Sequence, residues 1–298
     1  MPYTEQEVEA GLTSKSWKVR LQWAKRTDFQ PNYAQIERGL TDKSPEVRAA
    51  WIERTDIVLT PRQVDRGLKD KSWEVKNAWT RRMDFTPTPE QLKKLLEDKD
   101  WAIRQAWARR TDYTPTPEQV EIGINDRSGS VRRTWAERMD FTPTPEQVER
   151  GLKDEFSSIR CAWIRRTNWT PTPEQIEKGL LDEMWEVREA WARRPGYTPS
   201  PIQIARGMSD SKAMVRLAWA ERMDFTPTPE QIGLGLHDIS NEVVIAWIRR
   251  SDMTWSEETI QEGLQHKEKE VREAWAQLIQ NRHSHESQDA EPMEIYSL

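Results

Sequence analysis

Ten tryptophans recur at intervals of 28 residues without a single insertion. A period of this length is too long for a coiled-coil heptad and too short for a domain, and it is typical of stacked-repeat proteins. Because such repeats bury their core between neighbours, we expect one ten-repeat body over residues 1–280, followed by a flexible acidic tail over residues 281–298. The regularly spaced residues, called here the Trp column, are Trp23, Trp51, Trp79, Trp107, Trp135, Trp163, Trp191, Trp219, Trp247 and Trp275.

The composition limits where the protein works. The chain has 298 residues, with 45 Lys and Arg against 50 Asp and Glu and a net charge of −5. No apolar run approaches the ~20 residues needed to span a bilayer, and the first residues lack the basic-then-apolar pattern of a signal peptide. Cys161 is the only cysteine, so no internal disulfide forms and no oxidising compartment is implied. We expect a cytoplasmic protein with no membrane contact.

Each repeat carries the start and stop signals of two helices. Five copies open with Thr-Pro-Thr-Pro-Glu-Gln, as at residues 86–91, where the second Thr, the following Pro and the Gln suit a capping box. On the second helix Val75, Ala78 and Trp79 fall at i, i+3 and i+4, which predicts one buried stripe. Ser72 is expected to cap this helix, and the Thr-Pro pair that follows the helix ends it. The predicted fold is all-α.

A glycine stands twelve residues before nine of the ten column tryptophans. A mid-helix Gly costs about 1 kcal/mol relative to Ala, so its recurrence indicates that a large group approaches the backbone there. We expect the indole of the Trp column to pack into this notch. Repeat four has Leu95 instead and is expected to pack differently. The notch glycines are Gly11, Gly39, Gly67, Gly123, Gly151, Gly179, Gly207, Gly235 and Gly263.

The repeat resembles a known family. Residues 39–51 and 151–163, GLTDKSPEVRAAW and GLKDEFSSIRCAW, share Leu-x-Asp, four residues, Val or Ile, Arg and then Ala. This pattern resembles short bacterial HEAT repeats, and the 28-residue period is nearer to the variant leucine-rich type. The resemblance covers residues 4–280 and implies a right-handed α-solenoid of ten two-helix repeats whose second helices line the concave face. Members of this class are mostly protein-binding scaffolds, and some bind DNA in a basic groove.

The resemblance also implies a ladder of ion pairs between repeats. In HEAT proteins it is formed by the loop Asp and by the Arg that follows Val. The corresponding residues here are Asp42, Asp70, Asp98, Asp126, Asp154, Asp182 and Asp210 with Arg48, Lys76, Arg104, Arg132, Arg160, Arg188 and Arg216.

Binding residues are sought where the repeats differ, because residues present in every repeat serve stacking. The positions six and two before each column Trp and two after it lie at i, i+4 and i+8, so they form one stripe of the second helix. Trp and Arg are enriched at binding hot spots. A solvated helix face with a drifting sequence is the alternative interpretation. The predicted partner-binding residues are Trp73, Asn77, Arg81, Trp101, Gln105, Arg109, Arg133, Arg165, Trp185 and Arg193, with Glu189 inside the last stripe.

Two periodic columns invite a nucleic-acid interpretation. The Trp column suits base stacking, but it shares its stripe with Val and Ala, so we expect core packing. A second arginine column stands three residues after the tryptophans and suits a phosphate track. An Asp follows most of its members by two residues, and a helix C-terminus favours a cation, so we expect a structural role. This column is Arg26, Arg54, Arg82, Arg110, Arg138, Arg166, Arg194, Arg222 and Arg250.

Catalysis has little support in the sequence. The chain has four histidines, none in a metal-binding spacing on a helix, and Cys161 has no His near it in the sequence. We therefore expect no enzyme activity, no metal and no cofactor. Some DNA-binding HEAT proteins have glycosylase-like activity, but the sequence singles out no carboxylate for it. The helix start is similar to that of TAL effectors, yet the period and the absence of their glycine pair set the chain apart.

The charge pattern decides the predicted function. The first helices are net acidic, the second-helix segments are net basic, and repeats one to six hold almost all of the positive excess. We expect a non-catalytic scaffold, adaptor or stoichiometric inhibitor that grips an acidic protein surface with its second-helix face. The alternative is a nucleic-acid-binding protein that uses the same groove, and no small-molecule substrate is inferred.

Overall fold

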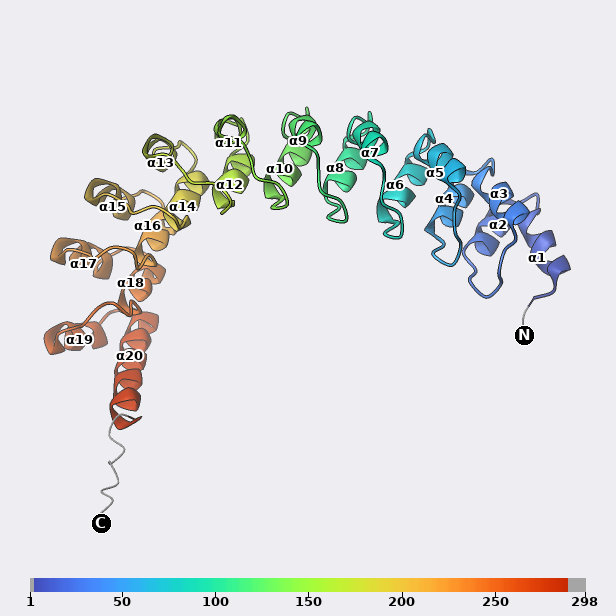
Figure 1. Ribbon diagram of the computed structural model, residues 1–298. Coiled ribbons are helices and arrows are strands. Elements are labelled where there is room, and N and C mark those ends of the chain that lie inside the picture. The colour runs from blue at the N-terminus through green and yellow to red at the C-terminus, as the bar shows by residue number, and fades with distance from the viewer. Residues whose placement is uncertain (1–2, 289–298) are drawn as a thin grey trace, which may run out of the picture. The chain divides into compact units, whose positions relative to one another are not determined.

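The computed structural model describes residues 3–288, in which twenty helices follow one another in ten pairs and no strand occurs (Figure 1). The first helices of the pairs are α1 (Glu5–Leu12), α3 (Tyr33–Leu40), α5 (Pro61–Leu68), α7 (Pro89–Leu96), α9 (Pro117–Ile124), α11 (Pro145–Leu152), α13 (Pro173–Leu180), α15 (Pro201–Met208), α17 (Pro229–Leu236) and α19 (Glu257–Leu264). The second helices are α2 (Trp17–Ala24), α4 (Pro45–Glu53), α6 (Trp73–Arg81), α8 (Trp101–Ala108), α10 (Gly129–Glu137), α12 (Ser157–Arg165), α14 (Trp185–Arg193), α16 (Ala213–Ala220), α18 (Asn241–Ile248) and α20 (Lys269–Gln288). The expected all-α solenoid of two-helix repeats is confirmed.

The chain divides into two units, of which the first ends at Gly151 and the second begins at Leu152. In the first unit the second helices α2, α4, α6, α8 and α10 each contact the next. In the second unit the same holds for α12, α14, α16, α18 and α20. Within each unit the first helices form another row, and neighbours in the second-helix row pack more closely than neighbours in the first-helix row. The second helices therefore form the inner row within each unit.

The first helices begin as the sequence predicts. At α5 the Thr60 side chain accepts a hydrogen bond from the Gln63 amide, and the Gln63 side chain accepts one from the Thr60 amide at 2.8 Å. These reciprocal bonds satisfy amides that would otherwise lack a partner at the helix start. The capping box is confirmed.

The second helices begin differently from the prediction. Ser72 occupies the N-cap of α6, but its side chain makes no capping bond and instead donates to Glu74. The Ser72 amide donates to Asp70 Oδ1 at 2.9 Å. The prediction that the Ser72 side chain caps the helix is therefore wrong, because its hydroxyl is engaged by the Glu74 carboxylate and not by an amide of the first turn. Asp70 also belongs to the ion-pair ladder described below.

The Trp column forms the core. From Trp51 to Trp275 its members are exposed by 2% or less, and only Trp23, in the first repeat, is half-buried. A Cβ atom built on a notch glycine would lie less than 3.0 Å from the indole of the Trp twelve residues later, which real Cβ atoms do not tolerate. This holds at Gly11, Gly39, Gly67, Gly123, Gly179, Gly207, Gly235 and Gly263. The predicted notch is confirmed, and the indole comes from the same repeat.

Repeat four accommodates its exception. Leu95 is buried, with 4% of its surface exposed, and Trp107 stays fully buried beside it. A cavity of about 350 Å³ lies next to Leu95, between α5 and α7, with Asp65, Leu68 and Thr88 in its wall. The larger side chain is thus accepted without exposing the indole.

The last helix is longer than expected. Helix α20 runs to Gln288, so residues 281–288 of the predicted tail are helical, and residues 289–298 lie outside the described part of the chain. Leu278 and Ile279 are partly buried and pack against the cluster that contains Trp275. The helix continues because no Pro or Gly follows Trp275 before residue 292.

Substitution of two helical glycines distinguishes the notch from ordinary helix propensity. Gly207 faces the Trp219 indole, whereas a Cβ at Gly233 in α17 would meet nothing within 4 Å. We expect Gly207→Ala to lower the free energy of unfolding by about 1–3 kcal/mol through overpacking. Gly233→Ala should raise it by about 0.5–1 kcal/mol. Urea denaturation followed by circular dichroism measures both, and a stabilising Gly207→Ala would contradict the notch.

Candidate functional site

A ladder of ion pairs joins successive repeats and defines one edge of each unit. Arg48 donates from Nε and Nη2 to both carboxylate oxygens of Asp70 in the next repeat, at 2.8 and 2.9 Å. Its Nη1 donates to the backbone oxygen of Asp42 in its own loop at 2.7 Å. The described pairs are Arg20–Asp42, Arg48–Asp70, Lys76–Asp98, Arg104–Asp126, Arg160–Asp182, Arg188–Asp210 and Arg216–Asp238. The ladder is therefore confirmed within each unit and extends to Arg20 and Asp238.

The ladder carboxylates are held ionised by their partners. Burial alone would raise the pKa of Asp70, but hydrogen bonds from Arg48 and from the Ser72 amide outweigh burial and hold this pKa below its usual value. Asp42 and Asp210 have lowered pKa values for the same balance of reasons. On the first-helix row, hydrogen bonds from Arg66 and Gln63 lower the pKa of Glu37 to about 2. These carboxylates contribute structure rather than acid–base chemistry.

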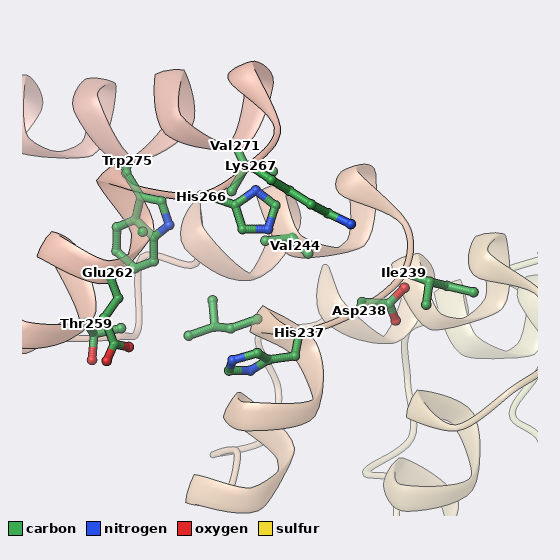
Figure 2. A pocket seen from close by; sticks show the side chains of 12 residues that line it. His237, Asp238, Ile239, Val244, Thr259, Glu262, His266, Lys267, Val271 and Trp275 are labelled. Atoms are coloured by element: carbon green, nitrogen blue, oxygen red, sulfur yellow. The ribbon is translucent and has the colours of Figure 1, made fainter.

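One rung of the ladder is missing between repeats nine and ten. Val244 stands where the other repeats have Arg or Lys, and His266 stands where repeats two to nine have the loop Asp. A cavity of about 310 Å³ opens there, with His266 and Val244 on one side and His237 on the other (Figure 2). Its wall includes the Trp275 indole and the Lys267 side chain.

The two histidines of this cavity have defined tautomers when neutral. His266 Nδ1 accepts the Glu268 amide at 3.2 Å, as the loop Asp does elsewhere, so the proton lies on Nε2. His237 Nδ1 donates to the Gly233 carbonyl at 2.9 Å, so its Nε2 is the unprotonated nitrogen. In the described part of the chain no group of three or more His, Cys, Asp or Glu is placed to hold a metal ion. His266 thus replaces the turn-forming role of the Asp but not its charge.

The second arginine column is buried and structural. Arg138 donates from Nη1 to the Ala108 and Arg110 carbonyls at 2.7 Å, which belong to the C-terminal end of the preceding second helix. Its Nε donates to Asp140 at 2.9 Å. From Arg54 to Arg250 the members are exposed by 8% or less. A phosphate track along this column is excluded by burial, and the carbonyl oxygens at the helix end are the groups that the arginines satisfy.

The predicted stripe of the first unit exposes two tryptophans. Trp73 on α6 is 46% exposed and Trp101 on the adjacent α8 is 50% exposed. Asn77 and Gln105 are half-buried one turn further along. Gln105 donates to the Ser130 carbonyl at 3.2 Å, so it bridges two repeats instead of facing solvent alone.

The arginines of the same stripe differ in their partners. Arg81 pairs with Glu53 of the preceding repeat, and Arg133 pairs with Glu137 at 2.8 Å. Arg109 is exposed and makes no ion pair within the described residues. Acidic residues of the second helices therefore neutralise Arg81 and Arg133, and the role of these arginines in partner binding stays a prediction.

The second unit carries the remaining predicted residues. Trp185 is half-buried because it packs against the core of the second unit. The Glu189 side chain is mostly buried and pairs with Arg193. Arg193 pairs with Glu189 at 2.9 Å and with Glu221 of the next repeat. Arg165 is exposed without an ion pair in the described chain. Trp185 and Arg193 are thus less available than the sequence pattern predicts.

Sequence reasoning missed one exposed aromatic residue. Trp17 on α2 is 40% exposed and stands six residues before Trp23, which is the position of Trp73 and Trp101 in their repeats. The same spacing that selected the other two would have found it. Exposed methionines also occur in the loops after the second helices, including Met83 and Met139.

The thiol of the single cysteine is shielded from solvent. Cys161 is buried, and burial raises the pKa of its thiol. Among the described residues no helix is both long enough and apolar enough to cross a membrane.

Comparison with known proteins supports the fold. Residues 34–53 and 203–218 match a family model described as a HEAT repeat associated with sister chromatid cohesion, and each match spans both helices of one repeat. The chain is also similar to a solved structure described as a leucine-rich repeat variant with a novel repetitive protein structural motif. The identity is 24%, the TM-score is 0.57, and the match covers 80% of this chain and 88% of that one. No curated protein matches the chain significantly. The chain therefore has the fold of a HEAT-like α-solenoid.

Restoring the missing rung tests the energy of the ladder. We expect Val244→Arg alone to destabilise the protein, because it buries an unpaired guanidinium. The double variant with His266→Asp should recover this loss, with a coupling energy of about 1–3 kcal/mol in a double-mutant cycle. The matched control is the reverse cycle, Arg188→Val with Asp210→His, at an existing rung. Additive single effects at both places would contradict the role given to the pair.

The lowered carboxylate pKa values predict a loss of stability in acid. A carboxylate with a pKa below its unfolded value stabilises the fold above the unfolded pKa, and this contribution is lost as the pH falls through the folded value. For Glu37 this window runs from the usual 4.5 down to about 2. We expect the urea concentration at the unfolding midpoint to decrease as the pH is lowered from 5 to about 2. Asp70→Asn and Glu37→Gln should lower stability at pH 5 and flatten this dependence, and an unchanged slope would contradict it.

Proposed function

We propose that the protein is a non-catalytic scaffold, adaptor or stoichiometric inhibitor that binds an acidic protein segment on the second-helix row of its first unit. The proposed site, called here the α6–α8 surface, consists of Trp73, Asn77, Arg81, Trp101, Gln105 and Arg109. The observation that carries the proposal is the pair of half-exposed tryptophans on adjacent helices, 46% and 50% exposed. Large aromatic side chains left in water are costly unless a partner covers them.

The charge around these tryptophans supports an acidic partner. Arg109 has no carboxylate partner within the described residues, and Arg81 forms an ion pair with one carboxylate there, that of Glu53. A carboxylate of the partner would find one guanidinium without an ion pair about two helical turns from the Trp101 indole. Arg beside Trp is a common composition of binding hot spots.

The same charges favour a protein over a nucleic acid. A duplex is bound by many cations that contact phosphates, but the second arginine column is buried, and Glu137 and Glu53 neutralise two arginines of the stripe. Few free cations remain on this part of the second-helix row. A nucleic-acid partner is kept as an outcome of the test.

The other predicted residues extend the proposal. Four further residues are proposed as secondary contacts, namely Arg133 in the first unit and Arg165, Trp185 and Arg193 in the second. Arg133 and Arg193 are engaged in ion pairs and Trp185 is half-buried, whereas Arg165 is exposed. A cytoplasmic location likewise stays a prediction.

Removal of the exposed indoles tests the proposal. We expect Trp73→Ala with Trp101→Ala to weaken capture of the partner by roughly 10- to 100-fold, because each indole is a candidate hot spot. Arg109→Glu should weaken capture further. Affinity purification from native lysate, with and without nuclease, followed by titration of the identified partner, measures both effects.

A matched control uses exposed apolar residues of the first-helix row. Ile202 and Leu234 are 70% and 58% exposed, and Ile202→Ala with Leu234→Ala should leave capture unchanged. Binding that is lost after nuclease treatment, with a salt slope near 0.9 per phosphate contact, would establish a nucleic-acid partner instead. Capture that is equal in all variants would place the working surface elsewhere.

A further inference from the structure

One member of the second arginine column has neither an Asp nor an Asn two residues after it, whereas Asn168 takes the place of the Asp after Arg166. Two residues after each arginine most repeats place an Asp, and the guanidinium donates to it from Nε and Nη2. Arg222 does so to Asp224 at 2.8 and 2.5 Å, and Arg250 to Asp252 at 3.0 and 2.6 Å. After Arg194 this position is Gly196.

Arg194 is nevertheless buried as deeply as the other members, at 4% exposure. Its Nη1 donates to the Ile164 and Arg166 carbonyls and its Nη2 to the Trp169 carbonyl at 2.8 Å, as elsewhere in the column. Its Nε, which the other arginines direct at the Asp, has no hydrogen-bond partner. The guanidinium thus keeps its place and lacks one acceptor.

The position of the missing side chain is open, although Arg194 Nε is itself buried. A Cβ at Gly196 would meet nothing within 4 Å, and the residue has a φ of +86°, which other L-residues rarely adopt. A cavity of about 580 Å³ lies beside it, and its wall includes Arg194, Gly196 and Met223. The neighbouring repeat fills the equivalent space with the Asp224 carboxylate.

The local charge is unbalanced by one. The wall of the cavity carries Arg193, Arg194 and Arg222 against Glu221 and Asp224. Arg193 is paired with Glu221, and Arg222 with Asp224, so the charge of Arg194 is the one left over. Burial lowers the pKa of Arg194 to about 10. Burial also lowers that of Arg222, but the hydrogen bond to Asp224, together with the charge of Asp224 and the contact with Tyr197, raises the pKa of Arg222 above its usual value.

We propose that the cavity between Arg194 and Gly196 binds an exogenous carboxylate, which occupies the position of the missing Asp and accepts from Arg194 Nε and Nη2. A bidentate carboxylate is the acceptor that matches this edge of a guanidinium. The carboxylate can come from a small organic acid or from an acidic side chain of a partner protein. The site does not depend on the α6–α8 surface, which lies in the other unit.

A variant that supplies the missing group tests the site. Pro195→Met with Gly196→Asp copies the sequence of residues 223–224 and removes the glycine at positive φ. Because an L-residue at a φ of +86° is strained, this filled variant is judged by its response to a carboxylate and not by its own Tm. Formate, compared with chloride at equal ionic strength, should raise the Tm of the wild type and leave that of the filled variant unchanged. An equal response of the two proteins overturns the proposal.

The next repeat provides a mirrored control. Met223→Pro with Asp224→Gly creates a second vacancy, at Arg222, and should increase the response to formate. Because any of these variants can fail to fold, the Arg194 Nε–H signal of the ¹⁵N-arginine-labelled wild type is followed during a formate titration. A saturating shift of this signal supports the site.

Two probes separate the sources of the carboxylate. A blocked Gly-Asp-Gly peptide is titrated beside formate, with Gly-Asn-Gly as its control. A shift of the Arg194 signal with the Asp peptide assigns the cavity to an acidic segment of a partner protein. A shift with formate alone assigns it to small carboxylates, and no shift with either probe overturns the proposal.

Discussion

The contact between an indole and the backbone of a helical glycine is the interaction on which most repeats depend, repeat four with Leu95 being an exception. The notch glycine lets the column Trp of the same repeat approach the first helix more closely than a Cβ atom would allow. This contact brings the two helices of a repeat together over only eight or nine residues each in all but α20. Such short helices are marginal by themselves, so the buried indole supplies much of the stability that the helices lack.

Two arginine columns then tie the repeats to one another in different ways. The ladder arginines reach forward to the next loop Asp, as Arg48 does to Asp70, while the buried column reaches back, as Arg138 does to the Ala108 carbonyl. Both use the planar, multiply donating guanidinium to satisfy acceptors in two repeats at once. Lys76 forms its ion pair with Asp98, but a lysine lacks the fork that would also hold its own loop carbonyl.

The periodic part of this structure could be predicted from the sequence, because a contact that recurs from repeat to repeat requires the same residue at the same position each time. The Gly-to-Trp spacing predicted both the notch and its occupant. The partners of the variable residues could not be predicted in this way. Arg81 meets Glu53 because adjacent second helices lie side by side with equivalent positions opposite each other. The sequence of a single repeat does not reveal this alignment. The role of Ser72 was missed because its hydroxyl donates to the Glu74 side chain instead of accepting from an amide of the helix. Trp17 was overlooked although its spacing revealed it.

The bonds between repeats join residues that are a fixed number of positions apart in the chain. Each ladder pair spans 22 residues, and the buried arginines reach carbonyls 28 and 30 residues earlier. One inserted residue in a loop would misalign a donor and its acceptor at that junction, whereas a whole block of 28 residues brings its own donors and acceptors with it. The length of such a protein is therefore quantised. It can grow or shrink by entire repeats, and a change of any other size must be absorbed by breaking a rung.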